Sequence, residues 1–171
     1  MSIAETHQNY SHDWWTPEPW LDWVRRTIGS NYYDPCPGNW NPDWPSGLEA
    51  KWRDPSYCNH PGSRGSTAKW WKKACHEMQE NEIELIWCAF NCEQLRHMYP
   101  PPFKLSGYLI MPRDRIPFIW GGPDIIPEKG KPRFHGKPMK SPGNWTVFWS
   151  TVAPARLPQE CVIIKTGSLY V

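Results

Sequence analysis

With 171 residues, of which 13 are Trp and 20 are Pro, the chain suits one domain with an aromatic core, little helix and long irregular segments. The formal net charge of +2 hides a gradient, because residues 1–60 hold four basic and eight acidic side chains whereas residues 104–140 hold eight and three. No apolar run reaches the roughly 18 residues of a membrane span, so we expect no membrane partner, and the basic second half suits a polyanion.

The first predicted elements are a flexible terminus, a helix and a short strand. Residues 1–12 are polar and without periodicity, so we expect a flexible N-terminus before a folded domain over 13–171. An apolar residue recurs every fourth position up to Gly29, which predicts an amphipathic helix that starts near Pro17. The stretch "NYYDPC" at 31–36 then predicts a short strand that ends in an acidic residue.

The middle of the chain alternates strands and helices. Residues 56–59 predict a second short strand, and the apolar stripe over 67–80 predicts a helix capped by its first threonine. The continuous apolar run "IELIWCAF" at 83–90 is typical of a strand buried on both faces of a sheet. Two further strands are predicted over 107–112 and 145–152. This alternation predicts an α/β fold with a short mixed or parallel sheet of about five strands.

The six cysteines form no Cys-x-x-Cys pair, and the histidines are scattered, so we expect no metal site. The amino-terminal residues do not have the pattern of a signal peptide. Reduced thiols in a cytoplasmic protein are the simplest interpretation.

Two predicted strands end in residues that suit ligand binding. Asp-Pro-Cys at 34–36 follows the first strand, and Asn-His-Pro-Gly at 59–62 follows the second. In open α/β sheets ligands bind at the carboxyl edge, where we expect both segments to meet. An aspartate there can bind hydroxyl or amino groups of a nucleoside cofactor, and an asparagine can bind the edge of a base. Each segment alone also fits an ordinary turn.

Several segments occur in a fixed order along residues 13–152, namely "WWTPEPWLDWV", "YYDPC", "GLEAKW", "YCNHPGS", "IELIWCAF" and "GYLIMPRDRIPF". In sequence and spacing they resemble the small phage-type DNA N6-adenine methyltransferases, the Dam family of bacteriophages. The resemblance implies a single Rossmann-like domain with long Pro/Gly/Trp-rich loops that binds S-adenosylmethionine (AdoMet) and modifies DNA. A phage-encoded protein of this kind would act in the host cytoplasm.

The resemblance also implies roles for individual residues. Those that it assigns to the AdoMet pocket are Trp15, Thr16, Pro17, Asp34, Pro35, Cys36, Gly47 and Leu48. Those that match or replace the catalytic Asn-Pro-Pro-Tyr motif are Asn59, His60, Pro61 and Gly62. Basic residues at the strand ends and in the basic loop over 121–143 are candidate DNA contacts, although a solvated loop is an equally good interpretation: Arg64, Arg113, Arg115, Lys129, Lys131 and Arg133.

The chain departs from the family pattern at the motif itself. Ser46 stands where the family has an aspartate, and His60 and Gly62 replace the second proline and the terminal aromatic residue. Stacking of a base on an aromatic ring is worth about 1–3 kcal/mol, so loss of the ring at Gly62 requires a substitute or changes the activity. Rings close in the sequence are candidate substitutes: His60, Tyr57, Trp70 and Trp71.

Three hypotheses therefore stay open. The simplest is an AdoMet-dependent adenine methyltransferase with a variant motif. The second is a DNA hypermodification enzyme on the same scaffold, with another base or another transferred group. The third is a catalytically inactive, methyltransferase-like module that binds DNA or protein.

Overall fold

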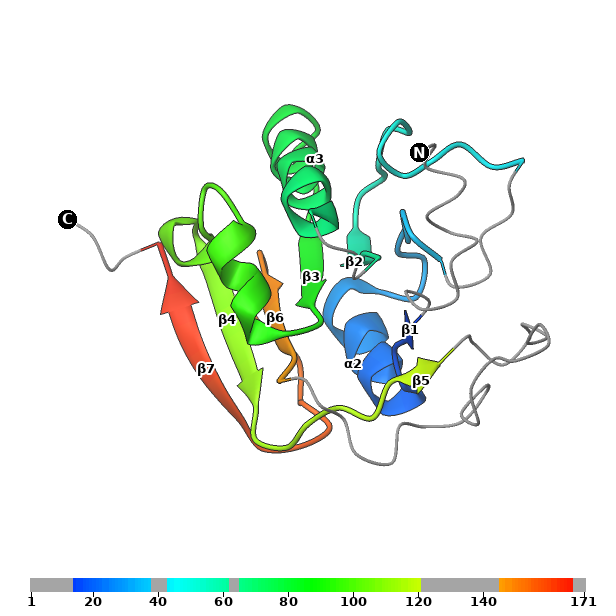
Figure 1. The fold of residues 1–171 in the computed structure, drawn as a ribbon. Helices are drawn as coiled ribbons and strands as arrows, with labels where there is room; N and C mark the ends of the chain where they lie inside the picture. The colour runs from blue at the N-terminus through cyan, green and yellow to red at the C-terminus, as the bar shows by residue number, and fades with distance from the viewer. Residues whose placement is uncertain (1–13, 38–42, 62–64, 121–144, 168–171) are drawn as a thin grey trace.

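The computed structural model describes residues 14–37, 43–61, 65–120 and 145–167 and shows a mixed α/β fold (Figure 1). Its centre is a five-stranded sheet in the order β2-β3-β6-β4-β7. The strands, in chain order, are β2 (Ser56–Asn59), β3 (Leu85–Ala89), β4 (Gly107–Pro112), β6 (Val147–Ser150) and β7 (Cys161–Thr166). The expected short mixed sheet is thus confirmed.

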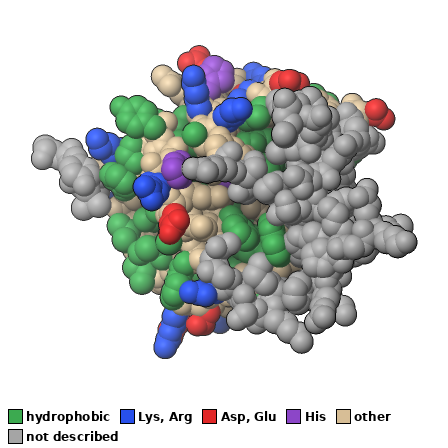
Figure 2. All heavy atoms as spheres, viewed as in Figure 1, with side chains coloured by type: hydrophobic (Ala, Val, Ile, Leu, Met, Phe, Trp, Pro, Cys, Tyr) green, Lys and Arg blue, Asp and Glu red, His purple; other side chains and the backbone are tan. Residues whose placement is uncertain are grey.

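The strand directions define one common carboxyl edge. β2 and β3 are parallel, and the helix α3 (Ser66–Glu80) connects them. β6 lies antiparallel between β3 and β4, so β4 runs in the same direction as β2 and β3. β7 pairs antiparallel with β4 and forms the far edge of the sheet. The exposed apolar side chains of Val162 and Ile163 belong to this edge strand, on the side of the molecule where Figure 2 shows hydrophobic atoms.

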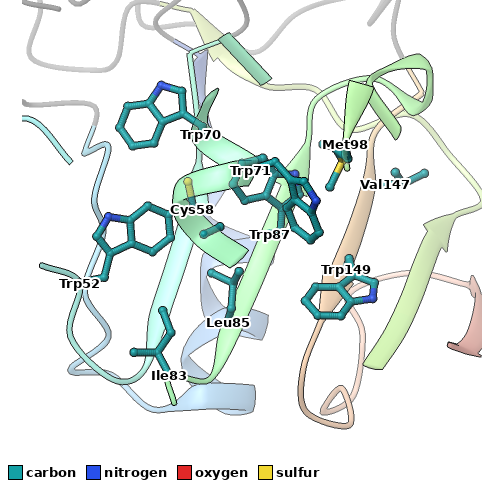
Figure 3. Close-up of a cluster of buried hydrophobic side chains, with 12 residues drawn as sticks. Trp52, Cys58, Trp70, Trp71, Ile83, Leu85, Trp87, Met98, Val147 and Trp149 are labelled. Carbon is teal, nitrogen blue, oxygen red and sulfur yellow. The ribbon is translucent and has the colours of Figure 1, made fainter. Parts of the chain in front are cut away.

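The helices α2 (Glu18–Ile28) and α3 pack on opposite faces of the sheet, and each covers alternate residues of the strands, since neighbouring residues of a strand point to opposite sides. The helix α2 covers one face through Trp20, Trp23, Val24 and Ile28, which pack on Tyr57, Ile86, Cys88, Ile110 and Phe148. The other face, under α3, is built from the intervening strand residues. Figure 3 shows this cluster, which includes Trp52, Cys58, Trp70, Trp71, Leu85, Trp87, Val147 and Trp149.

Tryptophan rings make up much of the core under α3. Trp71 meets Trp87 edge to face with ring centroids 5.1 Å apart, and it meets Trp149 in the same way at 5.6 Å. Its Nε1 donates to the carbonyl oxygen of Pro100 at 2.7 Å, which satisfies the polar end of a fully buried ring. The high tryptophan content therefore serves mainly to fill the core.

A buried carboxylate links α3 to the segment before β2. Glu77, on the buried face of α3, is 1% exposed. Its Oε1 pairs with Lys73 Nζ at 2.5 Å, and its Oε2 accepts from the Trp52 backbone N–H at 3.2 Å and from Asn81 Nδ2 at 2.6 Å. All of its interactions are charge-assisted, as a buried charge requires.

Replacement of Glu77 with alanine is expected to lower the free energy of unfolding by about 3 kcal/mol or more, because Lys73 and two N–H donors lose their buried partner. Urea denaturation followed by tryptophan fluorescence measures the change. Glu80→Ala, at an exposed position of the same helix, is the matched control and should unfold almost as the native protein does. Equal losses in the two variants would contradict the role assigned to Glu77.

Four details differ from the sequence-based expectations. The predicted strand over 31–36 is reduced to a single bridge between Tyr33 and Ser56. Helix α3 is preceded by Gly65, with φ 81°, and Thr67 lies buried inside the helix instead of capping it. Two-residue strands β1 (Trp14–Trp15) and β5 (Ile119–Trp120) pair antiparallel and were not predicted, and neither was β7. Apart from these differences, short 3-10 helices occupy Cys92–His97 (η2) and Pro102–Lys104 (η3).

The described part of the chain contains no helix with both the length and the apolar character needed to cross a bilayer. All six cysteines are free thiols.

Candidate functional site

The structure brings Asp34 and Asn59 to the same edge of the sheet. The Tyr33 backbone pairs in parallel with β2, through Tyr33 N–H to the Pro55 oxygen at 2.8 Å and Tyr57 N–H to the Tyr33 oxygen at 2.9 Å. Asp34 follows this bridge by one residue, and Asn59 ends β2 three residues beyond Ser56. The two side chains are therefore separated by about 7 Å along the strand direction and by one strand spacing across it.

Other strands end at this edge too. Phe90 directly follows β3, and Arg113 directly follows β4, which runs parallel to β3. Trp145 and Thr146 precede the antiparallel β6 and so lie at the same edge. This carboxyl edge is the place where open α/β sheets bind their ligands.

The orientation of the Asn59 amide is fixed by the segment before α2. Asn59 Nδ2 donates to the Trp14 carbonyl oxygen at 2.7 Å and to Thr16 Oγ1 at 3.3 Å. Thr16 Oγ1 in turn shares a hydrogen bond of 2.6 Å with the Tyr57 hydroxyl, and Thr16 is 6% exposed. Because both contacts use the nitrogen, the amide oxygen is turned to the opposite side, where it can accept a hydrogen bond.

Of the predicted cofactor residues Trp15, Thr16 and Pro17, Thr16 thus contacts the predicted catalytic residue Asn59 directly. Thr16 does not cap α2, whose first turn follows Pro17 without a side-chain cap. Its hydroxyl instead connects β2 to the amino-terminal segment. Burial raises the pKa of Tyr57 well above its ordinary value, so the phenol in this network is neutral.

Asp34 is a carboxyl group in a poorly solvated position. It keeps some exposed surface, yet the protein packed around it desolvates the carboxyl and raises its pKa to about 7, against a smaller lowering by the hydrogen bond from the Cys36 N–H. That N–H lies 2.8 Å from Asp34 Oδ1. A carboxyl group with a pKa near neutrality at a sheet edge is a reasonable ligand-binding group.

The segments around Asp34 and Gly47, both predicted to contact the cofactor, are in direct contact. A Cβ atom added at Gly47 would lie 2.0 Å from the Pro35 carbonyl oxygen, so only glycine fits there. Trp52 Nε1 donates to the Gly47 oxygen at 2.6 Å and holds this approach. Ser46, at the position where the family that the sequence resembles has an aspartate, accepts from the Leu48 N–H through Oγ at 3.2 Å and stabilises the local turn. Cys36 and Leu48 pack against the core under α3.

His60 does not lie where a base could stack on it, which corrects the expectation from the sequence. Because Asn59 points to the α2 face, the next side chain points to the α3 face. The His60 ring is 3% exposed and stacks on Trp87 with centroids 4.8 Å apart. Its Nδ1 lies 2.9 Å from the Pro61 oxygen. Burial lowers the pKa of His60 to about 4, so the ring is neutral near pH 7.

His60 is expected to make stability depend on pH. Its pKa is 6.5 in the unfolded chain and about 4 in the folded protein, so its contribution is complete above pH 6.5 and is lost as the pH falls toward 4, by about 3 kcal/mol in all. Asp34, with its raised pKa, acts in the opposite direction and loses its contribution as the pH rises from 3.8 to 7.

Urea denaturation of His60→Phe between pH 7 and pH 4 isolates the histidine, because phenylalanine retains a ring against Trp87 but does not titrate. The variant should lose less stability on acidification than the native protein. His76→Phe, at an exposed position of α3, is the matched control. An unchanged pH dependence in His60→Phe would refute the role given to burial.

The predicted DNA contacts are only partly described. Arg113 and Arg115 lie exposed at the carboxyl edge, after β4. Arg113 forms an ion pair with Glu160, and the Arg115 guanidinium lies 5.5 Å from the centre of the Trp145 ring. The remaining residues predicted to contact DNA, together with one residue of the motif, lie outside the described residues: Gly62, Arg64, Lys129, Lys131 and Arg133.

One residue at this edge, Phe90, was not recognised in the sequence as a candidate for the site. Phe90 stacks with Trp14 at the carboxyl edge, with ring centroids 5.8 Å apart. Its position directly after the most apolar strand was the available signal, since β3 is parallel to β2 and ends at the same edge. The contact with Trp14 joins residues far apart in the chain, and no local pattern indicates it.

A cavity of about 550 Å³ lies at the other edge of the sheet, near the amino ends of β3 and β4. It is lined mainly by apolar side chains, among them Met78, Ile83, Leu105 and Trp149. None of the predicted site residues lines it. The edge that carries Asn59, and not this cavity, holds the polar groups suited to the predicted chemistry.

Among the described residues, no three His, Cys, Asp or Glu side chains are grouped so that they could hold a metal ion. Comparisons with protein-family models, with curated proteins and with solved structures gave no match for this chain.

Proposed function

We propose that this protein is an AdoMet-dependent DNA modification enzyme with a Rossmann-like fold, most simply a DNA adenine N6-methyltransferase with a variant catalytic motif. The observation that carries the proposal is the placement of Asp34 and Asn59 on neighbouring parallel segments at one carboxyl edge. The arrangement puts a group suited to a nucleoside cofactor next to a group suited to a base.

The described side chains offer groups that fit AdoMet. The Asp34 carboxylate can accept hydrogen bonds from the hydroxyl or amino groups of such a cofactor. The buried Nε1 of Trp15 has no hydrogen-bond partner among the described residues and can donate to a carboxylate or a ring nitrogen. The same is true of Trp23 and Trp87, but these two rings are fully buried in the core clusters, whereas Trp15 is partly exposed and its chain neighbours Trp14 and Thr16 bind Asn59.

The chemistry requires positioning more than acid or base catalysis. AdoMet supplies a methyl group on a positively charged sulfur. The Asn59 amide oxygen is free to accept one N–H of a target amine, and the Trp14 and Thr16 contacts prevent the amide from rotating. Such fixation orients the nitrogen lone pair toward the methyl group. AdoMet bound at this edge would supply the methyl group to that nitrogen and leave as the neutral thioether, and the amine would release one proton to water.

DNA is the proposed partner because cationic and aromatic groups share the reactive edge. Arg115 lies over the half-exposed Trp145 ring, and Arg113 is exposed although paired with Glu160. Arginines at such an edge suit phosphate contacts, which fix the register of a duplex. The ion pair is at the surface, so its loss on binding a phosphate costs little.

A DNA hypermodification enzyme is the second candidate. The observation that favours it is the burial of His60, which leaves the variant motif without an exposed ring of its own in the described part of the chain. A site changed in this way fits another base or another transferred group.

Calorimetric titration with AdoMet tests the cofactor half of the proposal. We expect saturable heat with one site per chain, and we expect ATP, which shares the adenosine but lacks the sulfonium and the amino acid, to bind far more weakly. Absence of heat up to millimolar AdoMet would remove the methyltransferase hypothesis. Salt-sensitive DNA binding in that case would favour the inactive binding module.

A further inference from the structure

We infer that Trp14 and Phe90 together form the aromatic wall on which the target base stacks, in place of the aromatic residue that the motif lacks at Gly62. The wall deepens the proposed function and rests on it, because it assigns the base-binding half of the same site. The ligand that it fits is a planar base that carries an exocyclic amine.

The two rings form one continuous surface at the reactive edge. Their centroids are 5.8 Å apart with an angle of 26° between the ring planes. Trp14 belongs to β1 and Phe90 directly follows β3, and both side chains are partly exposed. A partly exposed, stacked pair of rings can extend its stack by one more planar group.

The wall adjoins the amide of Asn59. The Trp14 carbonyl oxygen accepts the hydrogen bond from Asn59 Nδ2 at 2.7 Å, so the residue that carries one ring also orients the amide. Asn59 pairs with Cys88 in the parallel β2–β3 register, and Phe90 follows two residues later, on the same face of the sheet as Cys88. The amide oxygen and the rings therefore lie on one side of the sheet, the side covered by α2.

The wall is rigid before any ligand binds. The Phe90 ring packs edge to face against Phe118, with centroids 5.1 Å apart, and Phe118 is 1% exposed. The Phe90 carbonyl oxygen accepts from the buried hydroxyl of Thr146 at 2.9 Å. A ring that is already held in place loses little conformational freedom when a base stacks on it.

The other candidate rings are buried. His60, Tyr57, Trp70 and Trp71 are 3%, 1%, 3% and 0% exposed, respectively. Each of them packs in one of the two core clusters or, for His60, on the core ring of Trp87. These rings could reach a base only by leaving the core, whereas Trp14 and Phe90 already present exposed surface beside Asn59.

Binding of two single-stranded DNA oligonucleotides of equal length, one of adenine only and one abasic, tests the wall by fluorescence anisotropy. We expect Phe90→Leu and Trp14→Leu each to weaken binding of the adenine oligonucleotide about tenfold to a hundredfold and to leave abasic binding unchanged. Phe103→Leu, at an exposed ring on η3 near the opposite edge, is the matched control and should bind as the native protein does. Circular dichroism verifies that each variant is folded.

If folded Phe90→Leu and Trp14→Leu bind the adenine oligonucleotide as tightly as the native protein does, the two rings do not stack on the base and the inference is wrong. Equal binding of the two oligonucleotides by the native protein would overturn it as well. AdoMet titration of the same preparations separates this failure from that of the proposed function, because the wall does not contribute to the Asp34 side of the site. A preference for adenine that depends on Phe90 supports the wall even if AdoMet does not bind.

Discussion

Asn59→Ala is expected to lower the rate of methyl transfer to DNA about a hundredfold to a thousandfold, the usual effect of removing one preorganised polar group from a reacting centre. In the native protein the amide nitrogen is held by Trp14 and Thr16, which leaves the amide oxygen available as the proposed acceptor of the target amine. Alanine removes the acceptor and leaves the amine free to rotate. Transfer of a labelled methyl group from AdoMet to DNA measures the rate.

The control for this variant must separate chemistry from folding. Asn59→Asp retains an oxygen acceptor but loses the N–H donor to Trp14, so we expect activity between that of the native protein and that of Asn59→Ala. AdoMet binding should persist in both variants, because Asp34 and Trp15 are unchanged. Full activity in Asn59→Ala would show that the amine is held elsewhere.

Asp34→Asn is expected to weaken AdoMet binding about tenfold or more. The substitution should also abolish the part of the pH dependence of AdoMet affinity that comes from ionisation of this carboxyl group. Burial raises the pKa of Asp34 to about 7, so the carboxyl gains its charge as the pH rises through neutrality. If the charged form binds a cationic cofactor, affinity at pH 8 should exceed affinity at pH 6 by about tenfold, the change in the ionised fraction.

Ionisation of AdoMet itself changes its affinity for the native protein and for Asp34→Asn equally, so it cancels when the two proteins are compared. Calorimetry at pH 6, 7 and 8 gives the affinities. A native affinity that follows the same pH curve as that of Asp34→Asn would contradict a contact between Asp34 and the cofactor. Asp43→Asn, at an exposed loop position, is the matched control for loss of one negative charge.

Periodic segments of the chain could be predicted from the sequence because their packing is local. The four-residue spacing of Trp20, Val24 and Ile28 indicated α2, whose observed bounds are Glu18–Ile28. The continuous apolar run indicated β3, and all five of its residues are buried. Side chains alternate between the two faces along a strand, so the sequence alone could have placed Asn59 and His60 on opposite faces of the sheet. The prediction that His60 contacts a base overlooked this alternation.

Elements without a period could not be predicted in this way. β1 and β5 have two residues each. The segments that carry Trp14 and Ile119 are far apart in the sequence and pair only in the folded chain. β7 carries Val162 and Ile163, two neighbouring apolar residues that are both exposed, so its sequence has no alternation to recognise. The orientation of the Asn59 amide depends on a contact 45 residues away, which no spacing rule gives.

The common edge itself was predictable, and the reason is physical. Parallel strands that follow one another through a crossover end on the same side of a sheet, so polar residues at successive strand ends meet there. The bridge at Tyr33 suffices to place Asp34 beside β2 although the expected strand is absent. The contact between Trp14 and Phe90 was not predictable, because it joins the ends of two elements through side-chain packing.

Incubation of the native protein with methyl-labelled AdoMet and unmodified double-stranded DNA, followed by digestion and mass spectrometry of the nucleosides, tests the central claim most directly. We predict labelled N6-methyladenine, formed by the native protein and reduced at least a hundredfold in Asn59→Ala. DNA that emerges without any labelled nucleoside, from protein that is folded and binds both AdoMet and DNA, would contradict methyl transfer at the edge shared by Asp34 and Asn59.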